Sequence, residues 1–259
     1  MIPFVWRKSY AHGVVTSDEH INPSMLIVDV GRILFIGHVG VVEEHRVMVP
    51  IFAAGLDDEY KITINGAVER VRTRIASADQ VRSVDGLGKR LAVMPIDPAL
   101  SPPGEPADPT RCVELLNVLA HEFSLEAWVE LCSAIGLDEP DTDRPVALLE
   151  AMRLVRQSSD ENVAGAEIAE QVGFSLSHLQ HLFRAHVGTS IRSYRTWSRF
   201  VLLASGLADG LNITDAAAAA GFFDSAHVAR AFSQTFGVSP SFVFGGKTTI
   251  HVVASTQDL

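Results

Sequence analysis

The sequence contains one helical pattern twice, at about residues 165–184 and again at about residues 213–233. In each copy a short stretch with helical spacing contains an alanine, Ala169 or Ala217, and a glycine follows four residues later. A small side chain lets a second helix approach closely, and a glycine adopts the positive φ that often ends a helix. Each copy is therefore predicted to be a helix-turn-helix unit.

The residues after each glycine predict where the second helix begins and which face it exposes. Ser175 and Asp224 are suitable N-cap residues. Apolar residues at helical spacing predict the buried faces: Leu179, Leu182 and Phe183 in the first unit, and Val228, Ala231 and Phe232 in the second. The opposite faces carry the candidate DNA-contacting residues, which are Ser177, Gln180, His181 and Arg184, then Ser225, Ala226 and Arg230. Most of these side chains can hydrogen-bond to base edges or phosphates.

The chain around the two units completes a larger pattern. Its pieces are Gly173-Phe174-Ser175, Leu182-Phe183-Arg184, Gly188-Thr189-Ser190, Gly221-Phe222 and Phe236-Gly237-Val238-Ser239-Pro240, with a long apolar helix expected over about 191–208. This pattern resembles the DNA-binding domain of the AraC/XylS family of bacterial transcription regulators. The resemblance implies seven helices, with two recognition helices held in successive segments of the major groove.

The second unit departs from the family pattern. Ala226 and Val228 stand where a serine and a phenylalanine are common, and Phe223 occupies a turn position that is usually polar. In the first unit His181 stands where an arginine is common. The second unit relies on Arg230 among small or apolar neighbours, so we expect the first unit to carry most of the base reading and the second to act more as a docking clamp.

The charge of the chain limits how it can bind nucleic acid. The formal net charge is −10, and residues 1–144 hold 22 of the 31 acidic residues but only 13 of the 21 lysines and arginines. Residues 145–259 are therefore nearly neutral. With so few cations, affinity for phosphates alone should be weak, and tight binding must be selective for sequence.

Residues 1–108 are predicted to be mainly β. The expected strands are Met25–Val30, Arg32–Ile36, Val47–Ala53, Tyr60–Ile64, Ala67–Arg74 and Arg90–Ile96. Asn65-Gly66 between alternating apolar residues is a strong hairpin signal. Pro50 predicts an edge or a bulge in its strand. Several short strands separated by turns favour a small barrel or sandwich.

The family resemblance implies a cupin-like barrel that senses an effector in this N-terminal part. The expected fold class is thus α+β: a β-barrel or cupin-like sensor domain (1–108), a helical hairpin and linker (109–144), and an all-α DNA-binding domain (145–259). Trp6, Phe35, Phe52 and Tyr60 are candidate walls of a pocket for a small effector, although for each residue taken singly a place in the core is favoured.

Two helices are expected over about 110–122 and 125–135, where apolar residues repeat at helical spacing. In the family that the chain resembles, helices in this place commonly contribute to a homodimer, and RNA polymerase is a further partner if the protein is an activator. The segment Thr248–Val253 has the composition of a strand but no identifiable partner.

Other functions have weaker support. His12, His20, His38 and His45 could ligate a metal, but His45 is followed by Arg46-Val47 and lacks the paired histidine of a metal cupin. We expect no cofactor and no enzymatic activity. A cupin-like enzyme, metal-free or metal-dependent, with an appended DNA-binding domain remains an alternative, as does a regulator controlled by a protein partner.

The remaining features place the chain in a reducing compartment. Cys112 and Cys132 are too few for a disulfide framework and are expected to pack as small apolar residues. No apolar run reaches the roughly 20 residues that span a bilayer. The first residues also lack the pattern of a secretory signal, so a cytoplasmic location is expected.

Overall fold

The computed structural model describes residues 24–29, 31–100, 104–137, 144–161, 163–245 and 248–253. Residues 24–100, here called the β region, form β1 (Ser24–Asp29), β2 (Arg32–His38), β3 (Val41–Arg46), β4 (Ile51–Gly55), β5 (Tyr60–Ile64), β6 (Ala67–Val71), β7 (Thr73–Ala76), β8 (Val81–Asp85) and β9 (Arg90–Pro95). With β10 (Thr248–Val252) they form one sheet ordered β10-β1-β2-β9-β4-β7 and a second ordered β3-β8-β5-β6. The two sheets do not close into the expected barrel, because β6 and β3, at the edges of the second sheet, pair with no strand of the first.

Local turn chemistry explains the hairpin between β5 and β6. Asn65 and Gly66 have φ values of 49° and 85°, the pair of positive angles that a two-residue type I′ hairpin requires. The expected strand Ala67–Arg74 is split after Val71, so that β6 pairs with β5 in one sheet and β7 pairs with β4 in the other. The hairpin prediction is confirmed, and the single long strand after it is wrong.

The edge or bulge expected at Pro50 is also wrong. The strand begins only at Ile51, and β4 is central because it pairs with both β7 and β9. Pro50 thus stands just before the ladder, where its missing N–H costs no strand hydrogen bond. Its carbonyl accepts a hydrogen bond from the N–H of Ile96 at 2.9 Å.

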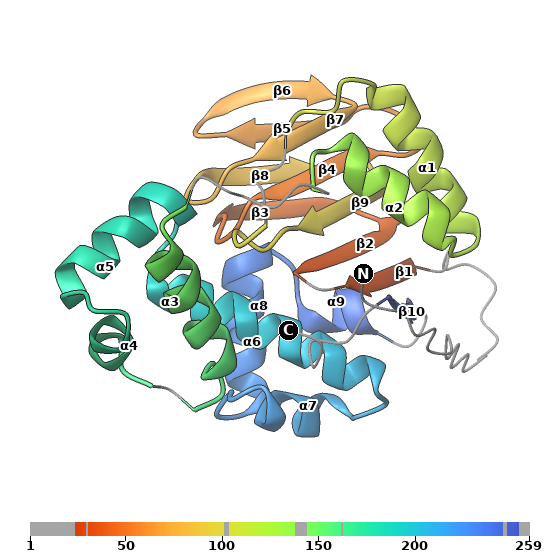
Figure 1. The fold of residues 1–259 in the computed structure, drawn as a ribbon. Helices are drawn as coiled ribbons and strands as arrows, with labels where there is room; N and C mark the ends of the chain where they lie inside the picture. Colours follow the sequence, from red (N-terminus) through yellow and green to blue (C-terminus); the bar gives the residue numbers. More distant parts are fainter. Residues whose placement is uncertain are drawn as a thin grey trace.

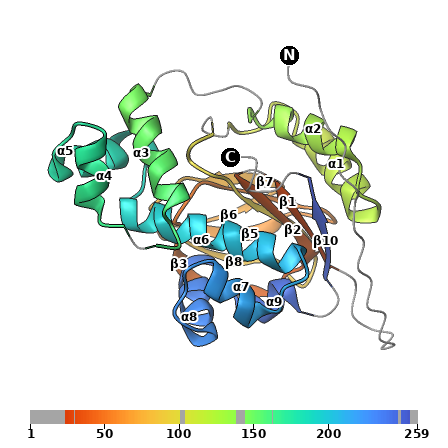
Figure 2. The same ribbon diagram turned by 60° about the horizontal axis from the view of Figure 1, so that its bottom comes forward.

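Alternation along the strands gives the six-stranded sheet two apolar faces. Ile27, Leu34 and Phe52 face the helical hairpin formed by α1 (Pro109–His121) and α2 (Leu125–Ala134). Figures 1 and 2 show this hairpin on one side of the sheet and the C-terminal helices on the other. The indole Nε1 of Trp128 donates to Asp29 at 2.8 Å, which ties α2 to the end of β1.

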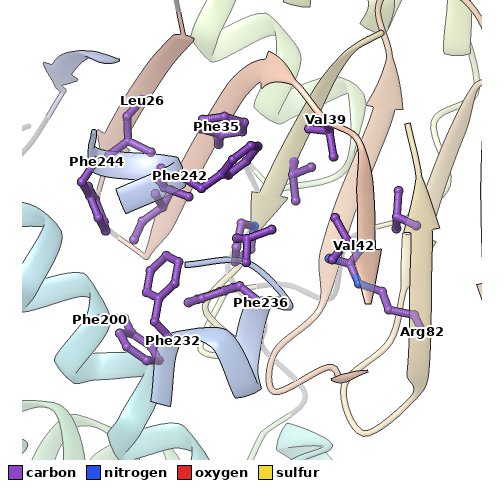
Figure 3. Close-up of a pocket in the computed structure, with 16 residues that line it drawn as sticks. Leu26, Phe35, Val39, Val42, Arg82, Phe200, Phe232, Phe236, Phe242 and Phe244 are labelled. Atoms are coloured by element: carbon purple, nitrogen blue, oxygen red, sulfur yellow. The ribbon is translucent and has the colours of Figure 1, made fainter. Parts of the chain in front are cut away.

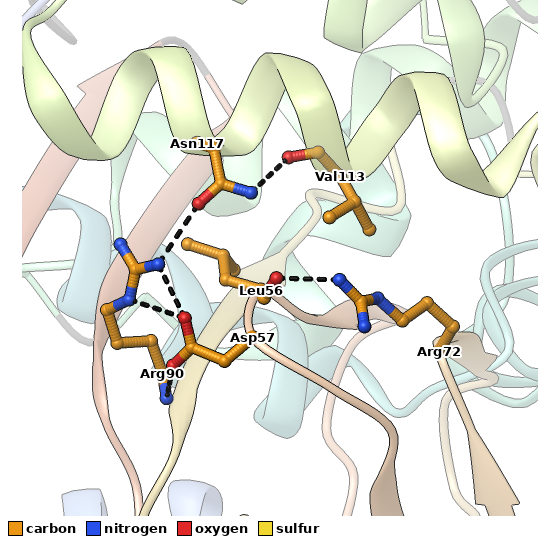
Figure 4. Close-up of polar contacts among 6 residues, drawn as sticks. All are labelled: Leu56, Asp57, Arg72, Arg90, Val113 and Asn117. Carbon is orange, nitrogen blue, oxygen red and sulfur yellow. Dashed lines mark hydrogen bonds and ion pairs between the residues drawn. The ribbon is translucent and has the colours of Figure 1, made fainter.

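Polar contacts complete the docking of α1. The guanidinium of Arg90 donates to Asp57 at 2.5 Å and to the side-chain oxygen of Asn117 on α1 at 3.2 Å, and Arg72 donates to the carbonyl of Leu56 (Figure 4). Asn117 in turn donates to the carbonyl of Val113 at 3.0 Å. Of these contacts, the bond from Arg90 to Asn117 joins α1 to the sheet.

The helical region (144–245) matches the expected pattern of helices. It contains α3 (Val146–Gln157), α4 (Gly165–Gln171), α5 (Leu176–Leu182), a π-helical turn (Phe183–Val187), α6 (Ile191–Ala208), α7 (Ile213–Ala219), α8 (Ser225–Phe236) and α9 (Pro240–Phe244). Within the described part of this region there are thus seven α-helices, as the resemblance implies. Ala169 and Ala217 are each 1% exposed, and Gly173 and Gly221 have φ values of 75° and 76°.

β10 joins the C-terminal segment to the β region. Its five residues pair in parallel with β1, from Ser24–Thr248 to Val28–Val252, and the hydroxyls of Ser24 and Thr248 lie 2.7 Å apart. The partner of the strand-like segment is therefore the edge of the six-stranded sheet. A local pattern could not identify this partner, because the two strands are more than two hundred residues apart in the chain.

The two helix-turn-helix units relate differently to the β region. Residues of α6, α7, α8 and α9 share one apolar core with the inner faces of both sheets; among them are Phe200, Ala217, Val228 and Phe232. The first unit packs mainly with α3 and α6 in a separate core, to which the β region contributes Val49 as its buried member. The second unit is therefore built into the β region.

Candidate nucleic-acid interface and ligand cavity

The first recognition helix is α5 with the π-helical turn that follows it. The hydroxyl of Ser175 accepts the N–H of His178 at 3.2 Å, which is the expected N-cap. Leu179 and Phe183 are fully buried, whereas the four predicted contact residues, Ser177, Gln180, His181 and Arg184, are all exposed. Arg184 lies on the π turn, which widens the helix where a continuous α-helix is expected.

The second recognition helix is α8. The carboxylate of Asp224 accepts the N–H of His227 at 2.5 Å and caps the helix. Val228 and Phe232 are buried, and Ser225, Ala226 and Arg230 are exposed. Both helices thus present the predicted residues to solvent at the ends that enter a major groove in such units.

A polar groove lies beside the second recognition helix. Arg230 and His227 of α8 line it together with Arg192 of α6. The β region forms another wall of this groove with Arg46 and Asp79, whose side chains make an ion pair at 3.2 Å. Arg230 is therefore exposed to solvent but lies near charged residues of the β region.

An apolar cavity of about 80 Å³ lies between the β region and the second unit (Figure 3). The β region contributes Leu26, Ile33, Phe35, Val39, Val42, Arg82, Val84, Val93 and Pro95, and the helical region contributes Phe200, Phe232, Phe236, Val238, Phe242, Val243 and Phe244. By volume it has room for about six water-sized groups. Its walls therefore belong to two parts of the chain, and α8 supplies one of them.

Of the described residues that line this cavity, Arg82 is the one that carries a charge. Its side chain is buried, and its Nε donates to Nε2 of His45 at 3.3 Å. Among the described residues, no acceptor lies within hydrogen-bonding distance of its Nη1. Burial lowers the pKa of Arg82 to about 10, so the guanidinium stays charged at neutral pH. An apolar cavity with a buried cation of this kind suits an anionic group on an apolar ligand.

His45 supports this arrangement in its neutral form. Burial, followed by the charge of Arg82, lowers its pKa from 6.5 to about 4. Since Nε2 accepts from Arg82, the proton is on Nδ1, which donates to the carbonyl of Glu43 at 2.9 Å. The C-terminal end of α8 packs closely against the His45 side chain. A Cβ added at Gly237, which follows α8, would lie only 2.7 Å from Nδ1 of His45.

Comparison with known proteins agrees with this geometry. Residues 168–244 match the family model described as "Helix-turn-helix domain". These residues form an AraC-type helix-turn-helix domain. The chain therefore contains a DNA-binding domain of this type, which spans 77 of its 259 residues. A search of curated proteins finds no match to its sequence.

Solved structures of ToxT from Vibrio cholerae share the fold of this chain. An apo form superimposes with a TM-score of 0.59 at 12% identity, over 84% of this chain and 98% of that one. The form bound to (E)-4-(8-methylnaphthalen-1-yl)but-3-enoic acid gives 0.55 at 12% identity, over 83% and 98%. The form with a bound unsaturated fatty acid gives 0.54 at 12% identity, over 82% and 94%. The likeness covers the β region together with the AraC-type domain.

The candidate wall residues end up in different places. Phe35 lines the cavity, whereas Phe52 lies on the other face of the sheet against the α1–α2 hairpin. Tyr60 is buried in the core, with its hydroxyl donating to the carbonyl of Ala53 at 3.3 Å, and Trp6 lies outside the described residues. Sequence reasoning missed Arg82 and the phenylalanines of the AraC-type domain. Alternation along β8 carries the signal, because Arg82 shares the inward face with Val84.

The other candidate groups give no further site. In the described ranges no group of three metal-ligating side chains comes together; His12 and His20 lie outside those ranges. Cys112 and Cys132 are buried as expected, and burial raises the pKa of Cys112 to about 11. No helix of the described residues is long and apolar enough to cross a membrane.

Proposed function

We propose that this chain is a sequence-specific transcription regulator whose DNA affinity responds to a small apolar carboxylic acid bound beside Arg82. The observation that carries the proposal is the cavity with one buried guanidinium, one wall of which is the inner face of a recognition helix. Ser177, Gln180, His181, Arg184, Ser225, Ala226 and Arg230 are the proposed DNA-contacting residues. We propose that the protein acts in the cytoplasm. The proposal includes no cofactor and no catalytic activity.

The chemistry of the cavity supports an acid as the effector. Its walls are almost wholly apolar, so they favour a hydrocarbon chain or ring. A carboxylate would give the buried Nη1 of Arg82 an acceptor, in a charge-assisted hydrogen bond strengthened by the apolar surroundings. The two ToxT ligands named above are both apolar carboxylic acids. The cavity is small, so it favours an acid with a short chain. An acid with a longer chain would have to displace one of the phenylalanine side chains in the wall.

The position of α8 supports coupling between effector and DNA. Phe232 and Phe236 face the cavity, while Ser225 and Arg230 on the same helix are exposed. A ligand that fits one position of α8 better than another shifts the population toward that position and so changes the fit to DNA. The first unit does not line the cavity, so the relative placement of the two recognition helices would change.

Ligand binding is tested with straight-chain and single-ring carboxylic acids, each paired with its primary alcohol. Acids should raise the Tm of the full chain more than the alcohols do. Arg82→Met, which replaces a buried charge by an apolar side chain of similar length, should weaken acid binding by at least about tenfold. Arg70→Met, at an exposed arginine of β6, is the matched control and should leave acid binding unchanged. Equal acid affinity in Arg82→Met and the wild type would refute the proposed site.

DNA binding is tested by selecting bound duplexes from a random pool, with and without the best acid. Enrichment of a defined site, and a change in affinity for it with the acid, are expected. Selection without enrichment would contradict sequence-specific binding.

A homodimer through the α1–α2 hairpin stays a prediction; Val118 and Val129 on it are half exposed or more. Contact with RNA polymerase is proposed only for an activator.

A further inference from the structure

Phe223 is the most exposed large apolar side chain among the described residues, at 91%. It lies in the turn between α7 and α8, directly before the N-cap Asp224. Its backbone N–H donates to Nδ1 of His227 at 3.4 Å, which fixes the turn while the ring stays in solvent. Exposure of a whole phenylalanine ring to water is unfavourable, and the ring adds nothing to the core.

The first unit has no counterpart of this residue. There a single phenylalanine, Phe174, separates Gly173 from the N-cap Ser175, and it packs edge-on against His178. In the second unit Phe222 takes the buried role and contacts Phe200 at 5.4 Å between ring centroids. Phe223 is thus an additional residue between the glycine and the cap.

The surface next to Phe223 is also apolar. Ala226, Ala229 and Arg230 are exposed and lie on one face of α8, at spacings of three and four residues. On this face the methyl groups of Ala226 and Ala229 lie beside Arg230, and Phe223 stands just before the helix, at the end that enters a major groove in such units. The apolar group on the floor of that groove is the C5-methyl of thymine, which alanine and phenylalanine contact in protein–DNA complexes.

We propose that Phe223 contacts a thymine methyl group in the DNA half-site bound by the second unit, next to the base pair contacted by Arg230. The second unit then reads bases largely by apolar contact, and its preference is for thymine over cytosine at that position. This inference rests on the proposed DNA binding. We assign the contact of the Phe223 ring to a thymine methyl group rather than to a protein surface, because the ring lies next to the exposed face of a recognition helix.

The test uses the full chain and a duplex obtained from the random-pool selection. Each thymine of the second half-site is replaced in turn by deoxyuridine, which removes only the methyl group. At one position the wild type should lose about fourfold in affinity, the effect of burying one methyl group. Phe223→Ala should bind the thymine and uracil duplexes equally. Val68→Ala, at an exposed valine of β6, is the matched control and should keep the fourfold difference.

The outcomes separate the two proposals. If the wild type enriches no site, both the proposed function and this inference fail. If it binds its site but no thymine-to-uracil difference disappears in Phe223→Ala, only this inference fails. If Phe223→Ala keeps all DNA affinities and instead changes transcription in a reconstituted assay, the ring contacts a protein and the inference is wrong. Because the ring is exposed, Phe223→Ala should unfold at the same temperature as the wild type.

Discussion

The two helix-turn-helix units are almost the same inside and are attached differently to the rest of the chain. Ala169 and Ala217 are equally buried, and both turns contain a glycine with φ near +75°. The first unit packs with α3 and α6, whereas the second shares its core with both sheets. Similar local sequence rules thus build two units, and only long-range packing makes one of them a candidate for control by a ligand.

This difference assigns separate tasks to the two units. The first has its predicted base-reading residues on a helix that does not line the cavity. The second is held by α8 on β3, by α9 beside the cavity and by β10 on β1. A change in the cavity would therefore move the second recognition helix relative to the first. Experiments that treat equivalent positions in the two units in the same way test this comparison.

The largest expected difference is between Gly221→Ala and Gly173→Ala. Both substitutions place a side chain at positive φ, which costs about 1–2 kcal/mol. Only at Gly221 would the new Cβ also lie 2.5 Å from Cα of Asp160 and 2.7 Å from its carbonyl oxygen; Gly173 has nothing within 4 Å. Gly221→Ala should therefore cost about 1–3 kcal/mol more. Urea unfolding of the full chain measures both, and equal losses would contradict a tightly held second unit.

This pair of glycines also shows what the sequence could predict. Both glycines, both inward alanines and both N-caps follow from local rules of helix geometry, and the structure confirms them. The contact of Gly221 with Asp160 joins residues 61 positions apart, and no local pattern reports it. The limits of most helices were predictable for the same reason, since capping and helical spacing act within a few residues.

The cavity could be predicted only in part. Phe35 and Phe52 are both phenylalanines in predicted strands, so the sequence makes both of them candidate wall residues. Only Phe35 lines the cavity, whereas Phe52 lies on the opposite face of the sheet. Successive residues of a strand point to opposite faces of the sheet, so the register of the strand decides which side chains face the cavity. Because there are two separate sheets, each strand also has several possible partners, and the alternation of apolar residues does not identify the right one. The sequence predicts Phe232 only as part of the buried face of its own unit, because packing between the β region and the helices depends on contacts far apart in sequence.

Lower pH should weaken the second unit before the first. Above pH 6.5 His45 is neutral in both the folded and unfolded states; between pH 6.5 and about 4 only the unfolded state takes up the proton. The free energy of unfolding should then fall with decreasing pH, by about 2–3 kcal/mol over that range. Hydrogen exchange in α8, which rests on His45, should increase at a higher pH than exchange in α5.

The variant His45→Gln isolates this effect. It cannot take up the proton, so the slope of the unfolding free energy against pH between 5 and 6.5 should be smaller than in the wild type. Carboxylates such as Asp57, whose pKa is lowered by its hydrogen bond to Arg90, act at lower pH and stay in both proteins. The same slope in wild type and variant would mean that His45 is protonated in the folded chain.

The base-reading residues should also behave differently in the two units. Arg230→Ala should weaken specific binding by about 1–3 kcal/mol and relax the preference at one base pair, as expected for an arginine bound to guanine. Gln180→Ala and His181→Ala should each relax preference in the other half-site, with a larger combined effect on the selected sequence. An unchanged site profile in Arg230→Ala would show that the second unit is aligned wrongly. No loss of affinity in Gln180→Ala would remove α5 from base readout.

The smallest expected effects are those of the two N-caps. Ser175→Ala and Asp224→Ala each remove a side-chain acceptor for a backbone N–H, which should cost about 1 kcal/mol. Asp224→Asn keeps an equally good cap and so controls for the loss of the carboxylate charge. If the β region holds the second unit, exchange protection in α8 should fall less on Asp224→Ala than protection in α5 falls on Ser175→Ala. A helix that is anchored by long-range packing depends less on its cap than a helix that relies on local contacts. Equal losses of protection in α5 and α8 would therefore mean that the two units are held equally firmly, although their surroundings differ.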